Sequence, residues 1–452
     1  MENIGWILEV LLAFSFMIAI HEGGHFLACR LLGVEVEEFC IGFPPRIVSR
    51  KWGKTLYSIG SIPLGGFCKP QGGDLSGQTA EEINAKAPVP GDFLFASWWK
   101  RVIIFLAGPW MNYFSALFIA FFVLFIVGEK IPNEKPILGF VPPNSLAAQV
   151  GLQAGDEITR INNNPVTNFS LALEDMFKGM MQNPGKSALL TLKRGGQIKE
   201  VEYKGDLKKP EVDAGIYSYH PPILGVVHLM TPARKAGLKP GDKVLAINGK
   251  NVSEWGEVSY AIHNAASDDI QLEIERDGVT HQLTVRRSYN GIGKYIGVGP
   301  QVDDKDALTQ THSFNESLSL AWGWTGKASL GMLDGLGKLV TGKISLQQNI
   351  GGPISILRMM YQTASSGLED FLKTVAMISL MLWMMNLLPL GIVDGGQIVL
   401  CFIEGIKRQP LSVKIQDAYQ KAGLVLVGCL MLFAVFNDIW GWVLEKMNNQ
   451  LH

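Results

Sequence analysis

The stretch HEGGH at residues 21–25 closes an apolar run near the start of the chain. On a helix, an H-E-x-x-H pentapeptide places His21 and His25 one turn apart on one face, where both can bind the same zinc ion. Glu22 can then take a proton from a zinc-bound water. Residues 4–20 carry one charged side chain and predict a membrane-spanning helix that leads into the motif. We therefore predict a zinc-dependent protease that cuts other membrane helices.

An alternative is that the two histidines only make hydrogen bonds within a polar patch of a helix and bind no zinc. Ionisable residues inside a membrane segment are costly and usually functional, which argues against this alternative.

The composition is that of a membrane protein with a sizeable soluble part. Charged residues make up 18% of the 452 residues, below the soluble norm of about 25%. The net charge of −1 gives no indication of a nucleic-acid partner. The chain has five irregularly spaced cysteines, which argue against a cysteine-based zinc site.

Four apolar segments predict four spans, at about residues 4–27, 102–127, 371–390 and 423–443. For any one of them the alternative is a buried core helix, but together they predict a polytopic α-helical membrane protein. The first segment lacks the basic start and small-residue cleavage site of a signal peptide, so we expect it to be retained.

Lysine and arginine are frequent in the loops between the first and last pairs of spans. The positive-inside rule places these loops in the cytoplasm. We therefore expect a multi-pass protein of the bacterial inner (cytoplasmic) membrane. Both termini and the long middle segment would face the outside, which is the periplasm in a Gram-negative bacterium. The H-E-x-x-H motif and the end of the third span would lie at the same depth, toward the cytoplasmic side.

The end of the third span, NLLPLGIVDGG at residues 386–396, contains a candidate third ligand, Asp394. Catalytic zinc usually has three protein ligands and one open position. Pro389 and Gly391 would break the helix, and broken backbone at membrane depth is tolerated where it lines a polar site. The alternative is an ordinary helix terminus with a solvated Asp394. The shared depth with His21 and His25 favours the ligand role.

H-E-x-x-H in a first span and N-x-x-P-x-x-x-x-D-G at the end of a later one resemble the site-2 protease family of intramembrane zinc metalloproteases. FLAGPWMN at residues 105–112 resembles the A-G-P-x-x-N element of that family, and GGPI at 351–354 also matches. The resemblance covers nearly the whole chain. The layout is similar to that of the RseP type, the regulatory protease of bacterial envelope stress.

The resemblance implies that Zn²⁺ is held by His21, His25 and Asp394, and that Glu22 is the catalytic base. It implies substrate binding by the residues Asn386, Asn112, Gly65 and Gly66. It also implies single-span membrane substrates already shortened outside by another protease, such as an anti-sigma factor, and signal-peptide remnants. Departures from the family pattern are Gly23, Gly391 and Val393, none of which removes a ligand or the base. A site-2 protease of another pathway and a catalytically inactive scaffold are the rival hypotheses.

Residues 56–70 contain short apolar runs broken by glycine and proline, which favours a β-hairpin. An exposed strand edge could accept the unwound segment of a substrate helix. The family resemblance supports a membrane-re-entrant β-element here. A loop lying on the membrane surface is the alternative.

Residues 147–162 recur as residues 233–248, with the shared pattern G-L-x-x-G-D-x-[IV]-x-x-I-N. This pattern resembles the PDZ signature and predicts two extramembrane α+β PDZ domains. The segments 138–141 and 224–227 are candidate groove edges. PDZ domains bind peptides by strand addition. The tandem could instead act as a size filter over the active site, and the sequence leaves both roles open.

The predicted fold is thus a polytopic α-helical membrane protein with four transmembrane helices, a membrane-associated β-hairpin and two PDZ domains. In chain order the predicted layout is the first span with H-E-x-x-H (1–29), a cytoplasmic and re-entrant β loop (30–100), the second span (101–128), the PDZ domains (129–212 and 213–305), an interfacial amphipathic segment (306–370), the third span (371–396), a cytoplasmic loop (397–421) and the fourth span (422–444).

Overall fold

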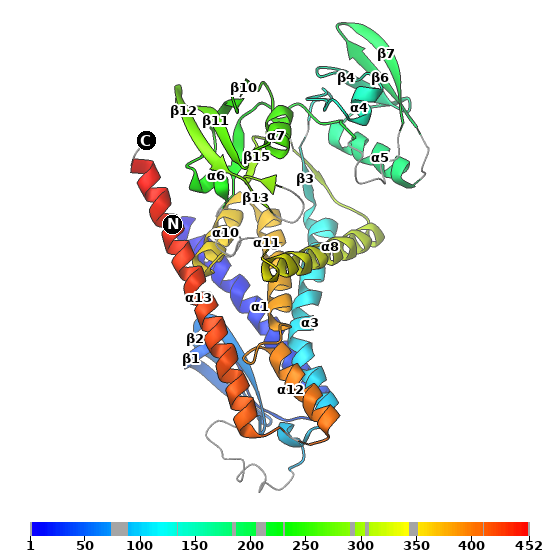
Figure 1. The fold of residues 1–452 in the computed structure, drawn as a ribbon. Helices are drawn as coiled ribbons and strands as arrows, with labels where there is room; N and C mark the ends of the chain where they lie inside the picture. The colour runs from blue at the N-terminus through cyan, green and yellow to red at the C-terminus, as the bar shows by residue number, and fades with distance from the viewer. Residues whose placement is uncertain are drawn as a thin grey trace. The chain divides into compact units, whose positions relative to one another are not determined.

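Figure 1 shows the chain as a computed structural model. The structure describes residues 2–73, 89–132, 134–182, 187–204, 214–228, 231–289, 294–302, 307–342, 351–409 and 411–450. The chain divides into two compact units. The first comprises Met1–Glu129, Thr311–Val340 and Gly351–Asp438, and the second comprises Lys130–Gln310, Thr341–Ile350 and Ile439–His452.

The first unit is mainly helical. Its helices are α1 (Glu2–Leu32), the 3-10 turn η1 (Phe93–Phe95), α3 (Trp98–Phe122) with its π-helical continuation η2 (Val123–Val127), α8 (Phe314–Val340), α10 (Pro353–Ser366), α11 (Leu368–Asn386), α12 (Asp394–Lys407) and most of α13 (Val413–Gln450). The segment predicted as one interfacial piece therefore contains two separate helices, α8 and α10. Residues 343–350 of that piece lie outside the described residues.

Three helices of the described part of the chain are long and apolar enough to cross a membrane: Leu8–Leu32, Trp98–Val127 and Val413–Trp440. They overlap three of the four predicted spans, and each begins or ends beyond the predicted limits. The helix expected to be the third span, α11, has only 19 residues. Its first two turns carry Glu369, Asp370 and Lys373, so a crossing at this position stays a prediction.

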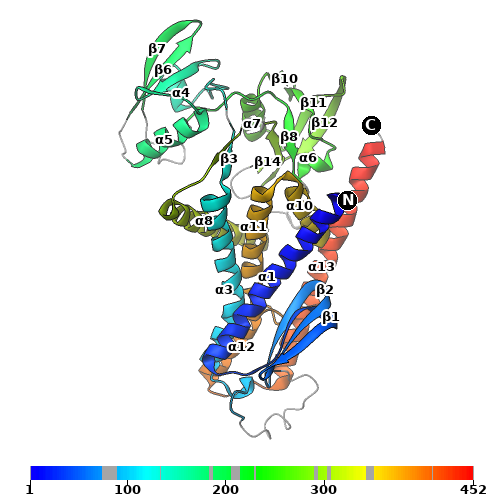
Figure 2. The same ribbon diagram turned by 180° about the vertical axis from the view of Figure 1, so that it is seen from behind.

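Helix α3 packs against α1, α11 and α12 and so joins the main helices of the first unit, and Figures 1 and 2 show it running beside α11. Met17, Ala116 and Ala376, from α1, α3 and α11, are fully buried in the core that these helices share. Small residues allow close approach. A Cβ atom on Gly24 of α1 would lie 2.4 Å from the carbonyl oxygen of Ala107 in α3. The second glycine of the motif is therefore required by helix packing.

A buried ion pair fixes α12 against α3. Arg101 Nη2 lies 2.6 Å from Glu404 Oε2, and the Glu404 side chain is 7% exposed. Glu404 Oε1 also accepts a hydrogen bond from the backbone N–H of Leu411. Breaking such a pair leaves an uncompensated buried charge. Because α12 begins at Asp394, this pair holds the helix that presents the candidate third ligand.

The GGPI element forms the start of α10, which Asp438 of α13 caps. The Asp438 carboxylate accepts hydrogen bonds from the backbone N–H groups of Gly352, Ile354 and Ser355. A carboxylate at a helix N-terminus satisfies donors that have no partner within the helix. A Cβ on Gly352 would lie 2.4 Å from an Asp438 oxygen, which explains the glycine before the proline.

Strands β1 (Val36–Trp52) and β2 (Thr55–Pro70) form one sheet. The hairpin predicted inside residues 56–70 is wrong in extent, since this segment is a single bent strand that pairs with β1 upstream. Phe39 pairs with both Tyr57 and Cys68, so the first part of β1 lies between the two halves of β2. The half containing Gly66 and Cys68 has no second strand partner among the described residues, which makes it an edge.

The second unit contains two four-stranded sheets with equivalent orders, β5-β4-β6-β7 and β10-β9-β11-β12. The elements of the first module are α4 (Leu146–Gln149), β4 (Glu157–Ile161), β5 (Asn164–Pro165), α5 (Phe169–Gln182), β6 (Ala188–Arg194) and β7 (Gln197–Tyr203). Those of the second are β8 (Leu224–Val227), α6 (Pro232–Lys235), β9 (Lys243–Ile247), β10 (Lys250–Asn251), α7 (Trp255–Asn264), β11 (Asp269–Arg276), β12 (Val279–Arg286), β13 (Ser288–Tyr289), β14 (Lys294–Tyr295) and β15 (Val298–Pro300). The short strands β3 (Glu129–Ile131) and β16 (Leu308–Gln310) pair with each other.

The repeated Gly-Asp step has the same role in both modules. Asp156 accepts a bond of 2.6 Å from Arg194 Nε, and Asp242 accepts one of 2.7 Å from Arg276 Nε. Each aspartate is almost completely buried. The predicted boundary at residue 212 is too early, because Leu138 bridges to Ser218 and Gly139 N–H donates to the Tyr217 carbonyl. The first module therefore extends through this returning segment.

We predict that Glu254 makes the stability of the second module depend on pH. Burial, helped by the charge of Glu257, raises the pKa of Glu254 from 4.5 to about 7. The folded module then binds more protons than the unfolded one between these values, so stabilisation present below pH 4.5 is lost as pH rises through 7. The loss should be about 3 kcal/mol. Native-state hydrogen exchange of β9 and β11 at pH 5 and pH 8 measures it. Glu254→Gln should remove the slope and Asp269→Asn, at an exposed site, should keep it.

Candidate functional site

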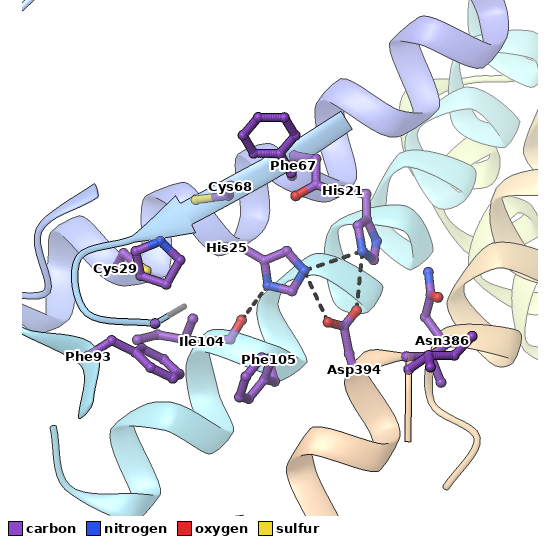
Figure 3. Close-up of a pocket in the computed structure, with 15 residues that line it drawn as sticks. His21, His25, Cys29, Phe67, Cys68, Phe93, Ile104, Phe105, Asn386 and Asp394 are labelled. Atoms are coloured by element: carbon purple, nitrogen blue, oxygen red, sulfur yellow. Dashed lines mark hydrogen bonds and ion pairs between the residues drawn. The ribbon is translucent and has the colours of Figure 1, made fainter. Parts of the chain in front are cut away.

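The two motif histidines and Asp394 meet in the first unit, although His25 and Asp394 are 369 positions apart in the chain (Figure 3). His21 Nε2 lies 3.2 Å from Asp394 Oδ2, and His25 Nε2 lies 3.4 Å from Asp394 Oδ1. The two Nε2 atoms are 3.3 Å apart. Ligands at about 2.0–2.1 Å from a tetrahedral zinc are about 3.3 Å from one another. The three donors therefore fit three corners of a zinc tetrahedron.

The helices position these donors in different ways. His21 and His25 lie on one face of α1 because they are four residues apart. Asp394 is the first residue of α12 and follows the break after α11. Its side chain is 15% exposed. The alternative that Asp394 is a solvated helix-end residue is therefore wrong, since its carboxylate points at the two imidazoles (Figure 3).

Helix α3 supports both rings. His25 Nδ1 lies 2.7 Å from the Ile104 carbonyl oxygen, which accepts its N–H and leaves Nε2 facing the other donors. Asn112 Nδ2 lies 3.2 Å from His21 Nδ1. Gly108 leaves room for the His25 ring, because a Cβ on that glycine would be 2.3 Å from His25 Nε2. The A-G-P-x-x-N element thus forms the wall behind the histidines.

Glu22 lines a cavity of about 340 Å³ beside the donors. Cys68, in the edge half of β2, lines the same cavity. A Cβ on Gly66 would lie 3.4 Å from Glu22 Cγ, so the strand runs directly past the carboxylate. The Glu22 carboxylate, the three possible metal donors and a strand edge therefore face one space. The cavity lining comprises His21, Glu22, His25, Cys29, Phe67, Cys68, Pro70, Gly73, Phe93, Ile104, Phe105, Asn386, Ile392, Val393 and Asp394.

The residues predicted to bind substrate are found in different places. Asn386, the last residue of α11, lines the cavity. Gly66 lies against Glu22, as described. Gly65 is packed against the Phe43 ring, where a Cβ would lie 2.0 Å from a ring carbon. Asn112 is fully buried and does not line the cavity, because its side chain points within the helix bundle toward His21.

Several lining residues were not predicted from the sequence. Cys29 follows His25 by four residues, a spacing that could have placed it on the same face. The contact of His25 with Ile104 uses a backbone carbonyl, which cannot be predicted from a pattern of side chains. Phe93 and Phe105 pack edge to face, with ring centroids 5.5 Å apart, and form an apolar wall of the cavity.

Comparison with known proteins matches one protein family over most of the chain. The family model of peptidase family M50 matches residues 9–430. The regulator of sigma-E protease RseP of Escherichia coli K12 is 31% identical over 453 residues, covering 95% of this chain and 97% of that protein. The protease RseP of Yersinia pestis is 30% identical, with coverage of 97% and 99%.

A protein of Vibrio cholerae whose name describes a candidate zinc metalloprotease is 32% identical, with coverage of 97% and 99%. The matched region includes the H-E-x-x-H helix and the Asp394 helix. The expected resemblance is confirmed, and the enzyme is a metalloprotease. The chain belongs to peptidase family M50, the site-2 proteases.

Proposed function

We propose that this membrane metalloprotease cleaves the transmembrane segment of single-span proteins, using Zn²⁺ held by His21, His25 and Asp394. The observation that carries the proposal is the triangle of donors, with sides of 3.2 to 3.4 Å, that opens on the cavity containing Glu22. When bound, zinc polarises the scissile carbonyl and lowers the pKa of a water molecule.

The chain's own residues supply the remaining chemistry. Glu22 takes the proton of the attacking water and passes it to the leaving amine nitrogen. A substrate helix hides its amides in its own hydrogen bonds and must unwind before hydrolysis. The free edge at Gly66 and Cys68 can pair with the unwound segment as an added strand. Asn386, at the opposite wall, can hold the substrate backbone through its carboxamide.

Relatives named as regulators of sigma E support a role in envelope-stress signalling. By that similarity the substrates would be an anti-sigma factor already shortened outside the membrane, and remnant signal peptides. The enzyme would lie in the bacterial inner membrane with four spans, α11 providing the third. Both termini and the repeated modules would be periplasmic, with the active site toward the cytoplasm. A site-2 protease of a different pathway would share all of this chemistry but not these substrates.

We further propose that the two modules of the second unit are PDZ domains. Their equal sheet orders and equivalent Asp-Arg pairs support a common fold. The second module has a cavity of about 480 Å³ between α7 and residues 295–298, next to the short strand β15. A cavity of this kind suits an extended peptide added to the strand. Size filtering is the other role, and it needs no peptide in the cavity.

The test is metal content and cleavage of the full-length protein in detergent. We expect about one zinc per chain, and cleavage of a model single-span substrate within its apolar segment. His21→Ala should lose both, while His281→Ala, on β12 of the second unit and outside both cavities, should keep both. If His21→Ala held as much zinc as the wild type, the proposed set of zinc ligands would be wrong. A zinc-loaded wild type that cuts no transmembrane substrate would favour the inactive scaffold.

A further inference from the structure

Asn112 has a fully buried carboxamide, and its nitrogen and oxygen atoms differ in their hydrogen-bond partners. Its Nδ2 lies 3.2 Å from His21 Nδ1. Its Oδ1 is buried and has no hydrogen-bond partner among the residues that the structure describes. An unsatisfied buried acceptor costs free energy and calls for an explanation. The predicted contact with substrate does not explain it, because Asn112 does not line the cavity.

The backbone at Asn112 is held from two helices. Its carbonyl oxygen accepts hydrogen bonds from Ser115 Oγ at 2.9 Å and from Ser379 Oγ at 3.0 Å. The two hydroxyl oxygens are themselves 2.7 Å apart. All three residues are buried where α3 crosses α11. This small polar cluster fixes the position from which the Asn112 side chain reaches His21.

The two ring nitrogens of His21 face different partners. Nε2 faces Asp394 and His25, and Nδ1 faces Asn112. A neutral imidazole carries a proton on one nitrogen and offers a lone pair at the other. Metal binding through Nε2 therefore requires the proton on Nδ1, where it needs an acceptor. A half-turn of the Asn112 carboxamide exchanges its nitrogen and oxygen within the same volume and places Oδ1 in that position.

We infer that Asn112 is a positioning residue that holds His21 in its Nδ1–H form through the amide oxygen, leaving Nε2 free to bind zinc. The Ile104 carbonyl does the same for His25, at 2.7 Å from its Nδ1. Both supports come from α3, so one helix sets the ring form of both histidines. This inference rests on the proposed zinc site and adds a member to it that touches neither zinc nor substrate.

The test compares zinc dissociation constants of the full-length protein in detergent, measured by chelator competition. Asn112→Leu keeps the approximate shape and removes the acceptor, and it should weaken zinc binding about 10–100-fold. Asn112→Asp keeps an acceptor and should bind zinc as tightly as the wild type or more tightly. Asn437→Leu replaces another buried asparagine, in α13, and should leave zinc affinity unchanged.

A purely structural role predicts a different pattern. Both Asn112→Leu and Asn112→Asp would then weaken zinc binding together with thermal stability, and that result would overturn the inference. Wild-type affinity in Asn112→Leu would overturn it as well. His21→Ala tests the zinc site itself, independently of the role of Asn112. If His21→Ala loses zinc while Asn112→Leu does not, only the positioning role is wrong.

Discussion

Glu22→Gln is expected to lower cleavage of a transmembrane substrate about 10²–10⁴-fold, the usual contribution of a general base. Zinc content should stay at the wild-type level, because Glu22 is not one of the three donors that lie together. Glutamine has nearly the same shape, but it cannot accept the proton of the attacking water. The change should therefore lower kcat much more than it raises KM. Single-turnover cleavage in detergent, with zinc measured on the same samples, checks this prediction.

Glu9→Gln is the matched control for this experiment. Glu9 is on the same helix, α1, and it is exposed and outside the cavity lining. Its substitution should leave cleavage and zinc content unchanged. Equal product from Glu22→Gln and the wild type would remove Glu22 from the mechanism. Loss of zinc in Glu22→Gln would show instead that the carboxylate helps to build the metal site.

The sequence predicts that His21, His25 and Asp394 lie together, because their positions follow from simple periodicity and orientation. The spacing of His21 and His25 requires only a helix, which the apolar run before them indicates. Asp394 required one more step, the positive-inside rule, which brings two helix ends to the same depth. The structure brings these three residues together, so distant parts of the chain could be paired without any structural information.

The sequence predicts the β-sheet and the supporting shell less well, because both depend on long-range contacts. Residues 56–70 have the composition of a hairpin, but their partner is β1, whose pairing no local pattern reveals. The family motif predicts that Asn112 contacts substrate, but no local pattern predicts its contact with His21, which is 91 residues away on another helix. The charged residues that begin α11 similarly obscure its assignment as a span.

Gly108→Ala is expected to abolish cleavage and to weaken zinc binding by at least about 100-fold, the upper end of the effect of losing support for one ligand. The added methyl would lie 2.3, 2.5 and 2.9 Å from three atoms of the His25 ring. The His25 ring cannot easily move away, because its Nδ1 is hydrogen-bonded to the carbonyl oxygen of Ile104. Ile104 lies one turn before Gly108 on α3. His25 Nε2 must therefore leave the donor triangle. Chelator competition and substrate cleavage in detergent measure the two effects.

Gly23→Ala adds the same methyl group one helix away and provides the control. No atom lies within 4 Å of a Cβ on Gly23, and alanine favours a helix over glycine by about 1 kcal/mol. This variant should keep zinc and activity and unfold at a slightly higher temperature. The contrast separates steric contact with His25 from any general effect of replacing glycine in a membrane helix. If Gly108→Ala bound zinc as the wild type does, His25 could not occupy the position that completes the donor triangle.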